Sequence, residues 1–380
     1  MNEHTVTYKK IRFFEGLNPL RFFAAFLVVM HHSETIRKKS GLFNLEWLGL
    51  FRNGNNAVTF FFVLSGFLIT YLLLREHDST STVSVKRFYM NRVLRIWPLY
   101  FLLVLIGTVL LPQLFSVFHI AYEMPYTFGQ VWYYFLFFVP GLATYFFGHH
   151  ILEPLWSIGV EEVFYLVWAP LFKFLKKWIL AVLCTVIAVK VVLMTLSFYV
   201  IKDPLFFYLV NSFQFEAMAI GGLGAYFIFN RNRSLQGLAI YRIPLQLFFY
   251  SLLAVYLAVN PNIHNPVWDA VFKTPVVSGL LLEFLFLYLI IGVSLIDNNI
   301  IKLKNRFLSY LGEISYGIYM YHMLMIYVII QFLGKYLMHL NAYLSTIGFY
   351  VTVFLLVLLV ASLSKAFFEN YFLGLKKKLR

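Results

Sequence analysis

The chain contains a single cysteine, Cys184, and few charged residues for its length. One cysteine excludes an intramolecular disulfide. Charged residues make up 13% of the 380 positions, and soluble domains carry about 25%. The sequence has no Cys/His cluster with metal-ligand spacing and no glycine-rich phosphate loop. It therefore predicts no metal site, and the single cysteine says little about the compartment.

Apolar residues fill 61% of the chain and gather in segments long enough to cross a membrane. The sequence predicts an all-α polytopic membrane bundle of about ten transmembrane helices. Their ranges are 17–36, 57–75, 94–112, 154–173, 178–200, 213–230, 243–260, 276–296, 307–331 and 343–366.

One further apolar segment, 129–147, does not fit this scheme. Counting it as a span would invert the placement of every loop that follows. We expect a re-entrant or interfacial segment instead, broken near Pro140-Gly141. No long polar stretch is left, so residues 1–380 are predicted to form one transmembrane domain with no appended soluble domain. The first apolar segment contains Arg21 and ends in HHSE, which is unlike a cleaved signal peptide.

The net charge of +14 could suggest a nucleic-acid partner. The basic residues, however, cluster at the ends of apolar segments, as at Lys173–Lys177 and 376–380, where they face the cytoplasm and its anionic lipids. Placing both termini in the cytoplasm puts most lysines and arginines on that side. The charge pattern therefore predicts membrane lipids, and no nucleic acid, as partners.

Arg21 and His32 lie eleven residues apart within an apolar run. Eleven residues bring a helix back to nearly the same face, with a rise of about 16 Å. Intramembrane ionisable groups usually face a protein interior or a water-filled path. A histidine there can take a proton from an alcohol or accept an acyl group itself, and Arg21 could hold an anion. The alternative is a structural histidine with a snorkelling arginine. His31 points away from this face.

Two adjacent glutamates, Glu161 and Glu162, enter the apolar span that begins at Pro154. A buried carboxylate could orient a histidine or stabilise its charged form. The alternative is pairing with loop cations at the membrane surface. Glu161 shares a helical face with Ser157. Two carboxylates in one span are expensive, which favours a functional role.

Three further patterns are weaker. Ser315, Tyr319 and His322 share one helical face, which indicates either a lined cavity or interhelical hydrogen bonds. Arg92 and Arg95 could bind phosphates by forked hydrogen bonds, although alone they are more typical of ordinary positive-inside residues. Ser65-Gly66 permits close helix approach or a bend. Glu216 and Lys190 are intramembrane charges to which the sequence assigns no role.

Five segments, in their order, resemble the acyltransferase-3 family of integral-membrane acyltransferases. They are LRFFAAFLVVMHH, FFFVLSGFLIT, RFYMNRVLRIWPLY, PLWSIGVEEVFYL and EISYGIYMYH, spread over residues 20 to 322. The resemblance covers most of the chain. Each motif alone is weak, and the ordered set is specific.

The resemblance assigns positions to the family's functional motifs. It implies catalytic roles for Arg21, His32, Glu161 and Glu162, and a donor-binding role for Arg92 and Arg95. Ser315, Tyr316 and His322 match the residues that line the donor path. Two positions depart from the pattern: Thr59 stands where many members carry an acid, and Val163 where glutamine often follows the glutamates.

The family resemblance implies O-acyl transfer, usually of acetyl, from cytoplasmic acyl-coenzyme A (acetyl-CoA) to a hydroxyl of a cell-envelope glycan or lipid-linked sugar beyond the membrane. It also implies a multi-pass protein of a bacterial inner membrane, in which a homo-oligomer is possible. Direct transfer and an acyl-histidine intermediate both remain open. The alternative is a transporter or flippase of a sugar-linked substrate, since many spans and intramembrane charges suit transport equally. A catalytically inactive relative acting as a sensor is a third reading, against which the retained Arg21 and His32 argue.

Overall fold

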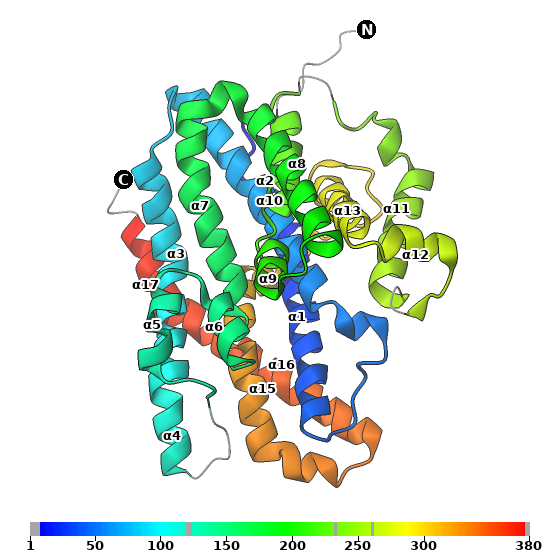
Figure 1. The fold of residues 1–380 in the computed structure, drawn as a ribbon. Helices are drawn as coiled ribbons and strands as arrows, with labels where there is room; N and C mark the ends of the chain where they lie inside the picture. Colours follow the sequence, from blue (N-terminus) through cyan, green and yellow to red (C-terminus); the bar gives the residue numbers. More distant parts are fainter. Residues whose placement is uncertain (1–7, 119–123, 232–233, 260–261, 377–380) are drawn as a thin grey trace. The chain divides into compact units, whose positions relative to one another are not determined.

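The protein is helical throughout the residues that the structure describes, and these contain no strand. The structure is a computed structural model that describes residues 8–118, 124–231, 234–259 and 262–376. Most of the basic C-terminus noted above, 377–380, lies outside them. The all-α prediction is confirmed for the described chain (Figure 1).

The chain forms two compact units, each assembled from segments that are far apart in the sequence. The first unit holds the residues up to Ala24, Leu48–Ser84 and Val167–Gly312. The second unit holds Ala25–Trp47, Val85–Leu166 and the chain from Glu313 onward. Helices α1 (Leu17–Lys39) and α7 (Leu155–Leu175) begin in one unit and end in the other.

The first unit is built around the packing of α2 on α10, with α8 against α10 and α13 against both helices. Its helices are η1 (Gly49–Arg52), α2 (Gly54–Thr80), η3 (Lys176–Trp178), α8 (Ile179–Tyr199), α9 (Pro204–Ser212), α10 (Phe215–Phe229), η4 (Ala239–Tyr241), α11 (Ile243–Val259), α12 (Pro266–Phe272), α13 (Pro275–Leu295) and α14 (Arg306–Glu313).

The second unit is built around the pair α15 and α16, with α3 beside α15 and beside the C-terminal helix α17. Its remaining elements are α3 (Val85–Leu105), the π-helix η2 (Ile106–Leu110), α4 (Leu111–Val117), α5 (Phe128–Leu136), α6 (Pro140–Phe147), α15 (Ser315–Met338), α16 (Ala342–Leu363), the π-helix η6 (Ser364–Glu369) and α17 (Asn370–Leu375).

Several helices start where the local sequence can satisfy their free backbone N–H groups. Asp203 caps α9 through the N–H of Phe206, and Asn341 caps α16 through the N–H of Leu344. Proline occupies the first turn of α6, α9, α12 and α13, where its missing N–H costs nothing.

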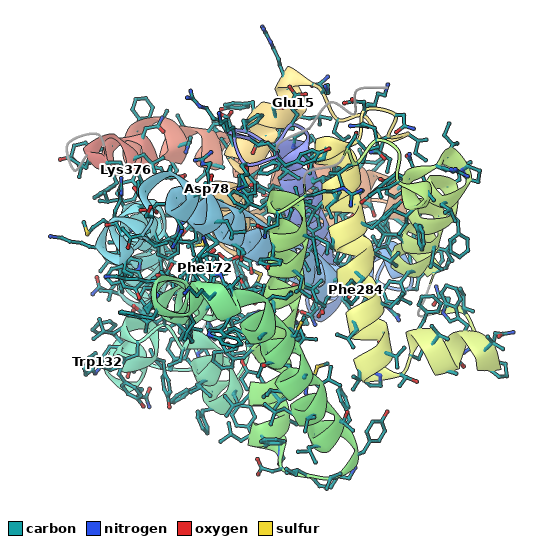
Figure 2. The ribbon with its side chains drawn as sticks, turned by 90° about the horizontal axis from the view of Figure 1, so that it is seen from above. Glu15, Asp78, Trp132, Phe172, Phe284 and Lys376 are labelled. Carbon is teal, nitrogen blue, oxygen red and sulfur yellow. The ribbon has the colours of Figure 1, made fainter. Side chains whose placement is uncertain are left out.

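Six helical stretches are long and apolar enough to cross a membrane, among the described residues. They are Gly54–Thr80, Val85–Val117, Leu155–Tyr199, Pro275–Leu295, Ser315–Met338 and Ala342–Leu375. Large apolar side chains also face outward from them: Phe284 on α13 is 49% exposed, whereas Phe172 in the same unit is fully buried (Figure 2). Such an exposed apolar surface on membrane-length helices is suited to contact with lipid. The count of ten crossings and the cytoplasmic termini stay predictions.

The segment 129–147 is two short helices, α5 and α6, separated by residues 137–139. Phe138 adopts a left-handed conformation with φ 57°, and Pro140 starts the second helix. The predicted break near Pro140-Gly141 is therefore confirmed. Neither helix reaches the roughly 20 residues that a crossing needs, because they have 9 and 8 residues. A re-entrant or interfacial placement stays a prediction.

Glycines allow α2 and α10 to approach until their backbones touch. A Cβ on Gly66 would lie 1.9 Å from the Met218 carbonyl oxygen, and a Cβ on Gly221 would lie 1.9 Å from the Val63 carbonyl oxygen. The close approach predicted from Ser65-Gly66 is confirmed. These contacts fix the helix pair at the centre of the first unit.

Replacing Gly66 by alanine is expected to lower the thermal unfolding temperature of the purified protein in detergent. The added methyl group meets rigid backbone, so the loss should reach or exceed the ~1–3 kcal/mol typical of overpacked cores. Gly129→Ala on α5 is the matched control, because nothing lies within 4 Å of its Cβ position. An unchanged unfolding temperature in Gly66→Ala would contradict the described packing of α2 on α10.

The two intramembrane charges without an assigned role pair with each other. Lys190 on α8 lies 3.3 Å from a carboxylate oxygen of Glu216 on α10, and Lys190 also donates to the Val210 carbonyl oxygen. Both side chains are almost fully buried. Burying a charge is tolerable when it is paired and hydrogen-bonded, so this pair ties α8 to α10 within the first unit.

Candidate functional site

The second unit brings two of the predicted histidines together. The rings of His32 on α1 and His322 on α15 lie 5.2 Å apart between centroids, inclined by 42°. His31 stacks edge-on against His32 at 5.2 Å. His322 is completely buried, and His32 is partly buried. Histidine side chains can take up and release protons near neutral pH, so two adjacent imidazoles inside an apolar bundle could take part in proton transfer.

Hydrogen bonding fixes the tautomer of His322. Its Nδ1 contacts the carbonyl oxygen of Tyr319, which can only accept, so Nδ1 carries the hydrogen. In the neutral ring Nε2 then carries a lone pair. Nε2 is buried and has no hydrogen-bond partner among the described residues. The site therefore presents an available hydrogen-bond acceptor beside His32.

Ser157, at the start of α7, and Tyr319 on α15 are joined next to these histidines. Their hydroxyl oxygens are 2.7 Å apart, and both hydroxyls also lie within hydrogen-bond distance of the Pro154 carbonyl oxygen. The Tyr319 ring is 5.7 Å from that of His322. This bond joins two motifs that the sequence analysis treated separately, the segment at Pro154 and the polar face of 315–322.

The adjacent glutamates face different neighbours, as their helical positions require. Glu162 accepts a hydrogen bond from the indole N–H of Trp97 at 2.9 Å. Glu161 accepts one from the Tyr165 hydroxyl at 2.8 Å. One oxygen of Glu162, Oε1, is buried and has no partner among the described residues. The described residues show no hydrogen bond between either carboxylate and His32, so the orienting role predicted for them stays a prediction.

Arg92 lies among the same acidic and aromatic side chains. Its guanidinium sits over the rings of Phe88 and Tyr165, 5.8 and 5.5 Å from their centroids, and it is within electrostatic range of Glu161 and Glu162. Arg95 is exposed one turn further along α3. The predicted arginine pair and glutamate pair therefore belong to one cluster.

Tyr316 and Ser315 begin α15 near this cluster. The Tyr316 hydroxyl donates to the Ile96 carbonyl oxygen at 3.0 Å, which places it against α3 between Arg95 and Trp97. Ser315 is buried at the first position of the helix. Arg21 lies on α1 before Ala25, in the part of that helix that belongs to the first unit. Its alignment with His32 rests on helical phase and stays a prediction.

A buried ion pair that the sequence analysis did not single out anchors α1 one turn beyond His32. Glu34 and Arg37 are both fully buried, with 2.8 Å between Oε1 and Nη1. Arg37 also donates to Thr346 at 2.7 Å and lies over the Phe349 ring. Glu34 accepts a further hydrogen bond from the Tyr350 hydroxyl. The i, i+3 spacing of these opposite charges is a signal that the sequence itself carries.

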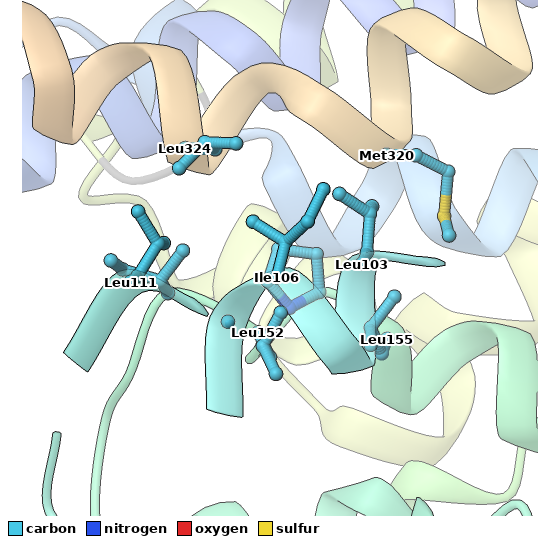
Figure 3. A pocket seen from close by; sticks show the side chains of 10 residues that line it. Leu103, Ile106, Leu111, Leu152, Leu155, Met320 and Leu324 are labelled. Carbon is cyan, nitrogen blue, oxygen red and sulfur yellow. The ribbon is translucent and has the colours of Figure 1, made fainter. Parts of the chain in front are cut away.

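An apolar pocket is lined by Leu103, Leu155 and Met320, among others (Figure 3). Pro154, whose carbonyl oxygen accepts hydrogen bonds from Ser157 and Tyr319, is also part of its lining. The π-helix η2 forms one wall of it, with Ile106 and Gly107. A Cβ on Gly107 would lie 2.6 Å from Leu152, so this glycine keeps the wall close to the segment before α7. Single π turns inside α-helices are frequent at functional sites.

The described residues contain no group of three or more His, Cys, Asp or Glu side chains that could hold a metal. His150 makes structural hydrogen bonds instead: Nδ1 lies 2.9 Å from the Tyr126 hydroxyl, and Nε2 lies 3.1 Å from Thr144 Oγ1. Its burial lowers the pKa of His150 to about 3, so it stays neutral at ordinary pH. Its neighbour His149 is exposed and bonds to Glu153.

Thr59, one of the two positions that differ from the family pattern, lies in the first unit. The Thr59 hydroxyl donates to the side-chain oxygen of Gln214 at 2.7 Å. Thr59 thus makes a neutral hydrogen bond at the position where the family resemblance leads us to expect an acid.

Comparison with known proteins identifies the class. A family model described as an acyltransferase domain matches residues 14–365, so the chain belongs to the acyltransferase-3 family. The predicted family is confirmed. Together with the six apolar helical stretches, this makes the chain a membrane protein. No solved structure matches the chain.

Curated relatives match over part of the chain. A Staphylococcus aureus (strain COL) protein named "Putative O-acetyltransferase" is 32% identical over 166 residues, 42% of this chain and 24% of that protein. The peptidoglycan O-acetyltransferase OatA of Listeria monocytogenes is 25% identical over 185 residues, 47% of this chain and 27% of that protein. The chain thus matches about a quarter of the length of these relatives.

Proposed function

We propose that this protein is a membrane O-acetyltransferase. It moves an acyl group, acetyl in the first instance, from cytoplasmic acyl-CoA to a hydroxyl of a cell-envelope glycan or lipid-linked sugar on the far side of an inner membrane. Membership of the acyltransferase family supports the reaction type. The names of the relatives, which include a peptidoglycan O-acetyltransferase, support a glycan acceptor.

The observation that carries the proposal is the buried, unpartnered Nε2 of His322 beside His32. In acyl transfer the acceptor oxygen bonds to the acyl carbon while the carbon–sulfur bond breaks, and the hydroxyl proton must go to a base. His32 takes that proton in our proposal, and His322 accepts a hydrogen bond next to it. The proton then passes to the departing thiolate, so the histidine returns to its starting state.

The arginine–glutamate cluster supports a separate site for the donor. Arg92 and Arg95 carry the positive charge that the phosphates of coenzyme A need. Glu161 accepts a hydrogen bond from Tyr165, whose ring lies against the Arg92 guanidinium, and both glutamates are within electrostatic range of Arg92, which keeps the cation in place. Ser315, Tyr316 and His322 would line the path of the donor toward His32, and the donor arm would pass Arg21 on the way.

The direct test uses the purified full chain in detergent or nanodiscs. Acetyl-CoA is expected to raise its unfolding temperature, since a ligand that binds the folded state alone stabilises it. Thioester cleavage should then depend on an added glycan acceptor, with the acetyl group recovered on that acceptor by mass spectrometry. Envelope glycans from cells with and without the gene identify the acceptor. A sugar transporter has no reason to bind acetyl-CoA, so the absence of both binding and cleavage would refute the proposal.

A further inference from the structure

Four basic side chains gather where the C-terminal helix packs on α3. Arg92 and Arg95 are on α3, Lys365 is on the π-helix η6, and Lys376 follows the end of α17. All four belong to the second unit, in which α17 contacts α3 (Figure 1). Figure 2 marks Lys376 at the end of the red C-terminal helix. Segments far apart in the chain thus contribute to one basic cluster.

Acidic side chains leave part of this cluster uncompensated. Arg95 and Lys376 form no hydrogen bond or ion pair with the described residues, and Arg92 Nε is buried with no partner there. Lys365 lies 3.9 Å from Glu369, and the Glu369 carboxylate is also within electrostatic range of Arg95. Glu161 and Glu162 are within electrostatic range of Arg92. Holding unpaired cations near one another is unfavourable unless an anion joins them.

The pKa of Lys376 reflects this surplus of positive charge. Burial and the positive charges of Arg95, Arg92 and Lys365 lower the pKa of Lys376 to about 8. No acidic group contributes to that shift. An anion placed among the four cations would oppose all three charge effects and favour the protonated lysine.

We propose that Lys365 and Lys376 complete, with Arg92 and Arg95, a phosphate-binding site for the nucleotide end of the acyl donor. The proposal rests on the proposed function for the identity of that donor. Coenzyme A carries a diphosphate and a separate 3′-phosphate. Arginines bind such groups with forked hydrogen bonds, and lysines bind them as point charges. The C-terminal helix thereby becomes part of the donor site.

The test measures binding of coenzyme A to the purified full chain in nanodiscs of neutral lipid. Lys376→Gln and Lys365→Gln are each expected to weaken coenzyme A binding about tenfold relative to the wild type. Lys376→Arg keeps the positive charge and should bind coenzyme A as the wild type does. Binding of acetyl-pantetheine, which lacks the nucleotide phosphates, should stay unchanged in every variant. Lys335→Gln is the matched control, because Lys335 is an exposed lysine on α15. A fall in affinity between pH 7 and pH 9 should also disappear in Lys376→Arg, since arginine keeps its charge.

Other outcomes separate this inference from the proposed function. If the wild type binds coenzyme A and both glutamine variants bind it with the same affinity, the proposed role of the two lysines is refuted. Coenzyme A then remains the proposed acyl donor. If the wild type binds no coenzyme A, the donor half of the proposed function fails. Inorganic pyrophosphate then tests the basic cluster alone, and lack of binding refutes it. If phosphatidylglycerol in the nanodisc, rather than coenzyme A, gives the lysine-dependent stabilisation, the cluster is a lipid site and the inference is overturned.

Discussion

Replacing His32 by alanine is expected to lower acetyl transfer by about 10²–10⁴-fold, the contribution typical of a positioned general base. The expectation follows from its contact with His322, whose Nε2 is buried and available. The measurement is the rate of acetyl-CoA-dependent acylation of the glycan acceptor by the purified variant. Binding of coenzyme A should change little, because the basic cluster proposed to bind its phosphates includes no residue of α1.

Two variants distinguish a chemical role from a structural one. His31→Ala removes the neighbouring ring and should retain most activity, because His31 lies off the face shared by Arg21 and His32. His322→Ala should lose activity comparably to His32→Ala, and the double variant should lose little more, since residues that act as a unit are not additive. Near wild-type transfer by His32→Ala, with normal folding, would refute the proposed base.

Arg37→Met is expected to destabilise the protein by about 3–5 kcal/mol, since it leaves a buried carboxylate without its counter-ion. Glu34 and Arg37 are both fully buried. Removing the arginine also breaks the hydrogen bond to Thr346. Thermal unfolding of the purified variant measures the effect, and loss of folded protein during expression would agree with it.

Two control variants test whether the loss comes from the buried ion pair. Adding Glu34→Gln to Arg37→Met should recover much of the loss, because the isolated charge is then removed. Lys38→Met removes the next residue, which pairs with Glu46 at the surface and is mostly exposed. Surface pairs contribute ~0–1 kcal/mol, so this variant should unfold nearly as the wild type does. Equal effects of Arg37→Met and Lys38→Met would contradict the buried pair.

The positions of most helices could be predicted because apolar runs are a local property. The range 178–200 became α8 at Ile179–Tyr199, and 276–296 became α13 at Pro275–Leu295. The start of α3 was missed: it begins at Val85, well before the predicted 94, because Lys86 and Arg87 hide a helical turn from a search for apolar residues. The break before Pro140 was also found, since proline cannot continue a helix from the preceding residues.

The sequence by itself determined the family, the all-helical class and which residues share each helical face, since composition and periodicity act along a single segment. Only the tertiary structure decided which faces meet. It paired Lys190 with Glu216, joined Ser157 to Tyr319, placed His322 against His32, and brought Lys376 to the arginines of α3. Helical phase orients a side chain about its own axis and carries no information about the neighbouring helix, which is chosen by packing across the whole unit.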